Sequence, residues 1–400
     1  MNILFVTHAP PLAPLDGASL IVHHLARELA APHTLYLCSL YAGERPNETR
    51  LSEYFADVRL APMPTRSWSV KWAESLNDST PLWVRAYDVP ALRLAVREML
   101  DTYPIDVVHC DTGLMAQYVD VLHHAPHIVA PHDSLTRVLE QNAQIATRPL
   151  ERMAARLQVD KMRRYEATTY PCFDRVVVVS AREREYLLSL APALNVSVIP
   201  NGVHTDEFAP SAAPVIPYTL GFLGAMDYAP NRDAALDFAR EILPRMQREI
   251  AEATFTIIGR NPRPDVCALA NDPRIRVTGT VDDVRPYVAA QSVMVCPMRA
   301  SGGIKNKVLE ALAMGKPVVA TPEAADGLDV RDGVELILET DAESFAAACV
   351  RLLRAPAERA RLGEAARAWA LQHTWHKTAH EYLNVYQMVM NAAEHAAAVG

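Results

Sequence analysis

Short apolar runs alternate with longer amphipathic segments along most of this 400-residue chain. The apolar runs carry hydrophobic residues at consecutive positions, as strands buried on both faces of a parallel sheet do. Between these runs, apolar residues recur every three or four positions, which is typical of helices with one buried face. The regular alternation predicts an α/β protein whose parallel sheets are covered by helices on both sides.

Ten strands stand out, which suits two similar α/β domains better than one. In the first half they are expected at Ile3–Thr7, Thr34–Ser39, Val107–Cys110, His127–Ala130 and Arg175–Val179. In the second half they are expected at Thr219–Leu223, Thr254–Ile258, Ile275–Thr278, Val293–Cys296 and Val318–Ala320. Clear helical patterns cover Ser19–Ala30, Ala91–Asp101, Asp233–Glu249 with a kink at Pro244, Ala342–Arg354 and Trp375–Ala397.

The clearest domain boundary lies near the middle of the chain. Pro200-Asn201-Gly202 ends one strand, and a connector rich in Pro and Ala then runs on to Pro217. Tyr218–Gly224 begins a new strand and a glycine turn. We therefore expect one domain at residues 1–203 and a second at 204–375. A C-terminal helix over 376–400 is expected to pack back on the first domain.

Composition narrows the function classes. The chain is 50% hydrophobic and 22% charged, with a net charge of −8, which is ordinary for a globular enzyme. Neither half is basic, so nucleic acid is not expected as a partner. Six scattered cysteines without a CxxC pair indicate thiols in a reducing compartment. No apolar stretch is long enough to span a membrane, and the N-terminus lacks the basic start of a signal peptide, so we expect a cytoplasmic protein.

The strongest candidate site is the stretch Ser301–Thr321, which reads as a glycine turn, a short helix and a buried strand. Backbone N–H groups at the helix start favour an anion, and Lys305 in the expected first turn adds a positive charge. Glu310, further along the helix, is placed to accept hydrogen bonds from hydroxyls. Gly315 is expected to end the helix. This layout suits the phosphates and ribose of a nucleotide, although an ordinary strand–helix unit with a solvated lysine fits the spacing too.

A second candidate site follows a strand of the first domain, at Ala130–Ser134. Open α/β sheets bind ligands at the carboxyl ends of their strands. We expect His132 to contact a ligand there and Asp133 to cap the next helix. The alternative is that either residue serves only the helix start.

A cationic helix is expected across residues 148–164. Its basic residues alternate with Leu150, Met153, Leu157 and Met162, which gives one apolar face and one basic face. Peripheral contact with a membrane is one interpretation, and a solvated face above a core stripe is the other. Glu151, Asp160 and Glu166 reduce the positive charge of this segment. The cations are Arg148, Arg152, Arg156, Lys161, Arg163 and Arg164.

Taken in order, the motifs resemble the family-4 retaining glycosyltransferases of the GT-B fold, and the resemblance covers nearly the whole chain. Pro200–Val203 looks like the linker between the two domains of that family. Gly221–Asn231 is similar to the glycine turn that opens its donor domain. Ile257–Pro262 and Val277–Asp283 match later turns in kind and order.

The resemblance implies two Rossmann-like domains that face each other across a cleft. It also implies transfer of a sugar from a UDP- or GDP-linked donor to a glycan or lipid-linked acceptor, with retention at the anomeric carbon. It implies no cofactor and no metal, since no DxD motif is placed for one. The implied catalytic residues are His132, Arg299 and Lys305. The implied donor-binding residues are Gly224, Gly259, Arg260, Val281, Gly302, Gly303, Ile304 and Glu310, and the implied acceptor-side loop holds Asp16 and Gly17.

Two departures from the family pattern affect these assignments. The family has two glutamates separated by seven residues, and Gly302 stands where the first would be. The chain thus resembles a branch with small residues there, and backbone N–H groups of the turn are expected to replace the acid. The second departure is at Met226, Asp227 and Asn231, where many relatives place Arg and Lys for the diphosphate. This leaves Arg299 and Lys305 as the expected phosphate cations.

Two rival functions on the same scaffold stay open. A sugar-nucleotide epimerase needs carboxylates aimed at the sugar, and none stands out. A nucleotide-sugar binding protein without transferase activity fits the missing first glutamate. A Rossmann dehydrogenase is not expected, because no G-x-G-x-x-G follows the first strand.

Overall fold

The computed structural model describes residues 1–12, 17–64, 79–122, 125–145, 149–299 and 303–399. The chain divides into two compact units. Unit 1 comprises Met1–Pro200 and Thr378–Gly400, and unit 2 comprises Asn201–Lys377. The sequence suggested breaks after residues 203 and 375, close to these positions.

A seven-stranded parallel sheet forms the centre of unit 1, in the order β3-β2-β1-β4-β5-β6-β7. The inner strands are buried on both faces, which is why they read as continuous apolar runs. The strands are β1 (Asn2–Thr7), β2 (Thr34–Tyr41), β3 (Asp57–Pro62), β4 (Val107–Asp111), β5 (His127–His132), β6 (Arg175–Val178) and β7 (Val196–Val198).

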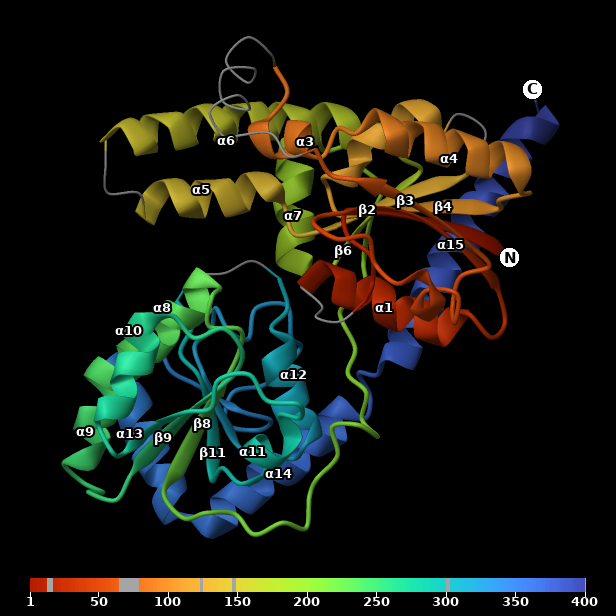
Figure 1. The fold of residues 1–400 in the computed structure, drawn as a ribbon. Coiled ribbons are helices and arrows are strands. Elements are labelled where there is room, and N and C mark those ends of the chain that lie inside the picture. Colours follow the sequence, from red (N-terminus) through yellow and green to blue (C-terminus); the bar gives the residue numbers. More distant parts are fainter. Residues whose placement is uncertain (13–16, 65–78, 123–124, 146–148, 300–302, 400) are drawn as a thin grey trace. The chain divides into compact units, whose positions relative to one another are not determined.

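Helices cover the sheet of unit 1 (Figure 1). Two of them, α5 and α6, lie side by side. The helices of unit 1 are α1 (Gly17–Leu29), α3 (Leu82–Ala86), α4 (Pro90–Thr102), α5 (Leu135–Ile145), α6 (Pro149–Thr169) and α7 (Ala181–Leu190), with short 3-10 segments η1 (Glu48–Arg50), η2 (Met115–Val121) and η3 (Tyr170–Cys172).

The last helix, α15 (Trp375–Val399), begins in unit 2 and continues in unit 1. Its buried Tyr382 stacks on the ring of His109 in β4 at 5.4 Å between centroids. The hydroxyl of Tyr386, also buried, lies 2.7 Å from Nδ1 of the same histidine. The C-terminal segment is therefore part of the core of unit 1.

Unit 2 contains a six-stranded sheet in the order β10-β9-β8-β11-β12-β13, again parallel throughout. Its strands are β8 (Thr219–Leu223), β9 (Thr254–Ile258), β10 (Ile275–Val277), β11 (Val293–Cys296), β12 (Val318–Ala320) and β13 (Ile337–Leu338). Its helices are α8 (Ala229–Asp237), η4 (Phe238–Ile242), α9 (Leu243–Gln247), α10 (Pro264–Cys267), η5 (Ala268–Asn271), α11 (Arg285–Ala289), α12 (Asn306–Ala313), α13 (Ala342–Arg354) and α14 (Pro356–Ala370).

Pro244 does not break the helical segment that contains it. A π-helical stretch, η4, separates α8 from α9, and Pro244 is the second residue of α9. Wider π turns are a common way to insert an irregularity into a helix. The structure therefore shows a change of helix type just before Pro244, where a kink was predicted.

The sheet order defines where ligands are expected in each unit. In unit 2 the chain runs from β8 outward to β9 and β10, and then returns to β11 on the other side of β8. This makes the carboxyl edge between β8 and β11 the topological switch point, the place where open α/β sheets bind ligands. In unit 1 the corresponding edge lies between β1 and β4.

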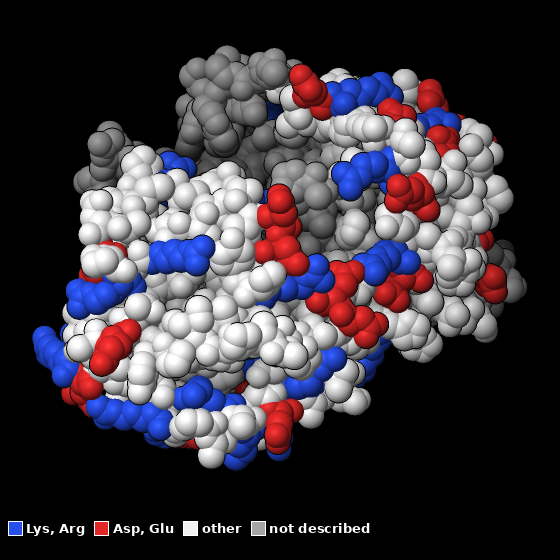
Figure 2. Space-filling view, turned by 60° about the horizontal axis from the view of Figure 1, so that its bottom comes forward, with Lys and Arg blue, Asp and Glu red and all other residues white. Residues whose placement is uncertain are grey.

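No helix in the described parts of the chain is long and apolar enough to cross a membrane. On the face that Figure 2 presents, Lys and Arg side chains are interspersed with Asp and Glu. The exposed face of α6 includes Met153 and Leu157, which are 65% and 39% exposed. The predicted apolar positions of the cationic helix are thus partly on its surface.

Candidate functional site

Two glycine turns touch at the carboxyl edge of the unit 2 sheet. Gly224 follows β8 and Gly259 follows β9, and a Cβ on Gly259 would lie 1.8 Å from the carbonyl oxygen of Gly224. Gly259 also has a φ of +152°, which favours glycine. The two loops are joined by a hydrogen bond from Met226 N to Arg260 O at 2.9 Å. Only glycine permits this close approach at the ends of two central strands.

The helix α12 begins beside these turns, after β11. Gly303 has a φ of +67°, Ile304 is buried, and Lys305 is the N-cap residue with an extended backbone. Lys305 was expected inside the first turn; the structure instead places it directly before the helix, with its ammonium donating to the Gly303 carbonyl. Gly315, with a φ of +65°, follows the end of the helix as predicted.

Lys307 reaches the switch point from the first turn of α12. Its ammonium donates a hydrogen bond to Oδ1 of Asn231 in α8 and lies 3.5 Å from the Met298 sulfur. It lies 5.0 Å from the centroid of the Phe222 ring. A Cβ on Gly224 would be 3.0 Å from this ammonium. Lys307 therefore spans the gap between the loops that follow β8 and β11.

Lys307 and Glu310 both carry shifted pKa values, and burial is the main cause for each. Burial, together with the neighbouring Lys305, lowers the pKa of Lys307 from 10.5 to about 8, against the opposing effects of Cys296 and Glu310. Burial raises the pKa of Glu310 from 4.5 to about 7, against the opposing effect of Lys307. No ion pair joins either side chain to another described residue. The switch point thus holds a cation and a carboxyl group whose polar atoms are only partly satisfied by the protein.

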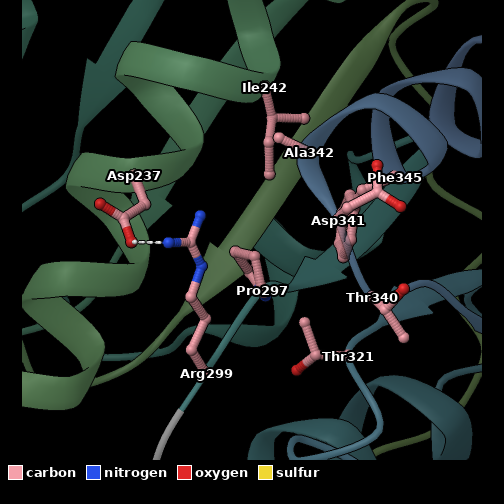
Figure 3. A pocket seen from close by; sticks show the side chains of 9 residues that line it. All are labelled: Asp237, Ile242, Pro297, Arg299, Thr321, Thr340, Asp341, Ala342 and Phe345. Carbon is pink, nitrogen blue, oxygen red and sulfur yellow. Dashed lines mark ion pairs between the residues drawn. The ribbon is translucent and has the colours of Figure 1, made fainter.

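The side chain of Arg299 points to acidic residues (Figure 3). Its guanidinium lies 3.6 Å from the carboxylate of Asp237 and 3.6 Å from that of Glu241, and its side chain is 61% exposed. It lines a small pocket together with Thr321 and Asp341. Its charge is therefore shared with two acids that Lys305 and Lys307 do not contact.

The main feature of the unit 1 edge is a buried His–Asp pair. Nε2 of His132 lies 2.8 Å from Oδ1 of Asp111, at the ends of β5 and β4. His132 is 7% exposed, Asp111 is fully buried, and His132 has a φ of +63° at an irregularity in the β5–β6 pairing. Nδ1 of His132 is buried without a hydrogen-bond partner in the described structure.

The charge state of Asp111 fixes how this pair is hydrogen-bonded. Burial raises its pKa, but the charge and hydrogen bond of His132 outweigh burial, with help from His8 and His109, and the pKa falls to about 2. The carboxylate is therefore ionised and accepts, so Nε2 of His132 carries the hydrogen. His8 follows β1, and its Nδ1 lies 3.8 Å from Oδ2 of Asp111. Burial lowers the pKa of His109 to about 4, so its ring is neutral.

Two buried acids hold the loop that carries His132. Glu183 of α7 accepts from the backbone N of Ser134 at 2.8 Å and from Arg137. Glu166 of α6 accepts from the Ser134 hydroxyl at 2.8 Å and from Leu135 N at 2.7 Å. The Ser134 hydroxyl in turn accepts from Arg137 N, so the capping bond observed for α5 comes from Ser134, one residue after the predicted Asp133. These bonds restrict the β5–α5 loop.

The remaining predicted residues have simpler surroundings. Asp16 and Gly302 lie outside the described residues. Gly17 is exposed at the start of α1, with open space around it. Val281 lies in the loop after β10, where Asp283 accepts from Arg285 N at 2.9 Å at the start of α11. Within the described ranges, no group of three or more His, Cys, Asp or Glu is arranged to hold a metal ion.

Two residues that lie at these sheet edges were not singled out from the sequence. Lys307 was not among the residues expected at the site. Asp111 follows a buried strand, and that position was a usable signal, because strand ends meet at one edge. Nothing in the sequence linked it to His132.

Comparison with known proteins supports the division into two α/β units. Residues 15–207 match the family model described as Glycosyltransferase Family 4, and residues 217–355 match the model described as Glycosyl transferases group 1. A D-inositol 3-phosphate glycosyltransferase from Saccharomonospora viridis is 28% identical over 252 residues, which cover 55% of this chain and 56% of that protein. The chain spans about half the length, or less, of the curated relatives it matches.

Two solved structures have the same architecture. Sucrose-phosphate synthase from Thermosynechococcus elongatus superposes with a TM-score of 0.76 at 20% identity, over 98% of this chain and 100% of that one. HepE from Anabaena, solved in complex with UDP-glucose, gives a TM-score of 0.67 at 15% identity, over 96% and 100%. At these identities the likeness shows the fold: two Rossmann-like domains with parallel sheets, of the GT-B type.

Proposed function

We propose that this chain is a retaining glycosyltransferase that transfers a hexose from a UDP- or GDP-linked sugar to a glycan, glycolipid or polysaccharide precursor. The two family matches and the GT-B fold support a glycosyltransferase of the family-4 type. UDP is the first nucleotide to test, because HepE was solved with UDP-glucose. The acceptor class rests on the resemblance seen in the sequence.

One observation carries the donor assignment: Glu310 is a partly buried carboxyl group without a hydrogen-bonding or ionic partner among the described side chains, on the helix that begins at the switch point. A desolvated acceptor of this kind is costly unless a ligand donates to it. The two hydroxyls of a ribose are suitable donors. The glycine turns at Gly224 and Gly259 meet at the same edge of the sheet.

In the proposed reaction, negative charge builds on the departing diphosphate while the sugar gains oxocarbenium character. Lys305 and the start of α12 stabilise the diphosphate, and Arg299 is proposed to assist. Fixed positive groups act strongly where water is excluded. Because these cations serve the diphosphate, the proposed reaction runs without a bound metal. His132 of unit 1 is proposed to hydrogen-bond the sugar.

Calorimetry with nucleoside diphosphates tests the donor site. Wild-type protein is screened against UDP, GDP and ADP, and the tightest binder is then measured with Glu310→Ala. Losing hydrogen bonds to a charged acceptor typically costs about 1.5–3 kcal/mol, so the affinity should fall roughly 10- to 150-fold. Glu358→Ala is the control, since that glutamate lies on α14 and pairs with Arg351. Equal affinity in a folded Glu310→Ala protein would remove the ribose assignment.

Product analysis separates the rival functions. A glycosyltransferase releases the nucleoside diphosphate and forms a new glycoside when an acceptor extract is added. An epimerase changes the sugar of the donor with no acceptor, and a binding protein leaves the donor unchanged. Retention is read from the anomeric coupling of the product by NMR.

A further inference from the structure

We propose that Lys307 binds the diphosphate of the donor nucleotide at the switch point between β8 and β11. This inference rests on the proposed function, and it adds a cation that the sequence pattern did not single out. It is carried by the position of the Lys307 ammonium, by the lack of a carboxylate in contact with it and by the two glycine turns beside it.

The groups in contact with the Lys307 ammonium include no carboxylate, although Glu310, three residues further along the same helix, acts on it electrostatically. The groups that contact it are the Asn231 amide oxygen, the Met298 sulfur and the face of Phe222. No carboxylate of a described residue lies within ion-pairing distance. A desolvated ammonium without a carboxylate in contact is unfavourable, and an anionic ligand would compensate for that cost.

Its place in the sheet favours a phosphate as that anion. The ammonium lies against Gly224, which touches Gly259, so two glycine turns and the start of α12 meet beside it. Glycine turns let a ligand approach the backbone closely, and helix starts favour phosphates. Lys305, 7% exposed, lies two residues earlier and adds a second positive charge. A diphosphate carries enough negative charge for both.

Asn231 explains why the cation comes from α12. Asn231 is buried on α8, the helix that follows the first glycine turn, and it offers Lys307 an amide oxygen. Its own NH₂ group donates to Ala225 O at 3.0 Å, which orients the amide. Asn231 therefore fixes the Lys307 ammonium between the two loops, and the ammonium supplies the charge that α8 lacks there.

The chain offers a matched control in Lys316. This lysine belongs to the same unit, is 7% exposed, and has a pKa that burial lowers to about 8. Its ammonium donates to Ala289 O at 2.8 Å, before β12 and so away from the carboxyl edge. Lys316→Met therefore removes a buried lysine without touching the proposed site.

The experiment compares a nucleoside diphosphate with its nucleoside by calorimetry, using UDP and uridine, and GDP and guanosine. Lys307→Met should weaken binding of the diphosphate about 10- to 100-fold, the effect of losing one charge-assisted hydrogen bond, while nucleoside affinity stays nearly unchanged. Lys316→Met should leave both affinities at the wild-type level, and Lys307→Arg should keep most of the diphosphate affinity. The melting temperature of unliganded Lys307→Met should not fall, because an uncompensated charge has been removed.

Each other outcome has a defined meaning. Unchanged diphosphate affinity in Lys307→Met overturns the inference while the proposed function stands. Equal loss for nucleoside and diphosphate assigns Lys307 a structural role and also overturns it. If wild-type protein binds no nucleoside diphosphate, the proposed function itself fails. Should Lys307→Met not fold, Lys307→Gln, which keeps a donor for Asn231, replaces it with the same expected result.

Discussion

Nε2 of His132 lies 2.8 Å from the ionised Oδ1 of Asp111, so the buried aspartate determines which imidazole nitrogen carries the hydrogen. Nδ1, which is buried, is thereby left without a hydrogen-bond partner among the described residues. The positive φ of His132 and the acids that hold the following loop restrict the ring further. A histidine fixed in one orientation is suited to a sugar hydroxyl or to developing positive charge.

Asp111→Asn should lower kcat roughly 10²-fold, at the low end of what a positioned proton-transfer or hydrogen-bonding group contributes. The amide retains the shape of the carboxylate but no longer imposes the tautomer or stabilises a protonated ring. Affinity for UDP or GDP should stay unchanged. Steady-state kinetics across pH check this, since the variant should also change the pH profile of kcat. A profile of wild-type shape and height contradicts the positioning role.

His132→Ala should reduce kcat strongly while leaving the affinity for free UDP or GDP nearly intact. The reason is that the proposed nucleotide site lies in unit 2, whereas His132 belongs to unit 1. Calorimetry and turnover measured on the same preparation decide the matter, with circular dichroism as the folding control. Loss of nucleotide binding would give His132 a different role, and full activity would reduce it to a loop residue.

Lys305→Ala should lower kcat by roughly 10²–10³, the range for losing one preorganised electrostatic contact. Arg299→Ala should have a smaller effect, because its guanidinium is shared with Asp237 and Glu241 and is well exposed. Donor turnover at saturating substrate compares the two variants. A larger loss for Arg299→Ala would show that this arginine leaves its acidic partners when substrate binds.

The affinity for a nucleoside diphosphate should rise and then fall with increasing pH. Glu310 accepts ribose hydroxyls best when ionised, so affinity should rise as pH passes about 7. Lys307 must stay protonated to bind phosphate, so affinity should fall as pH passes about 8. Glu310→Gln should remove the rising limb and Lys307→Met the falling limb, measured by calorimetry in buffers of equal ionic strength. A wild-type affinity that stays constant from pH 6 to 9 contradicts both assignments.

The pKa shifts of Glu310 and Lys307 should also change the stability of the unliganded protein with pH, in opposite directions. The raised pKa of Glu310 means that the folded state holds more protons between pH 4.5 and about 7, so stability decreases across that window. The lowered pKa of Lys307 means that the unfolded state holds more protons between about 8 and 10.5, so stability increases there. Urea denaturation at several pH values measures both trends, with Glu310→Gln and Lys307→Met as the controls.

The sequence predicts the central strands of both units well, because strands buried on both faces must be continuously apolar. It misses β3, β7 and β13, whose residues are only partly buried or too few to form a pattern. Spacing also placed Lys305 incorrectly, inside the first turn of α12. Which lysine enters the helix depends on where the helix starts, and here Lys305 is the N-cap residue. The Asp111–His132 pair depends on two strands lying side by side, a relationship that one sequence does not reveal.

The cationic face of α6 yields a test of membrane contact. Arg152 and Arg156 are exposed beside Met153 and Leu157, while Arg163 pairs with Glu140 and Asp160. About 1 kcal/mol per cation near an anionic surface is available, and the paired arginine contributes less. We expect weak sedimentation with anionic vesicles at low salt that disappears at high salt. Arg152→Glu with Arg156→Glu should abolish it, and no sedimentation of the wild type leaves a solvated face.

The two segments that build unit 1 impose an order on synthesis and folding. The core around His109 is completed by Tyr382 and Tyr386, yet all of unit 2 is translated before those tyrosines. At ~5–20 residues per second, Tyr386 is made about ten to forty seconds after Pro200. The continuous second unit can therefore fold on the ribosome while the surface of unit 1 that α15 later covers is still exposed. Chaperones that protect exposed apolar surface would then act chiefly on the part of the protein that is made first.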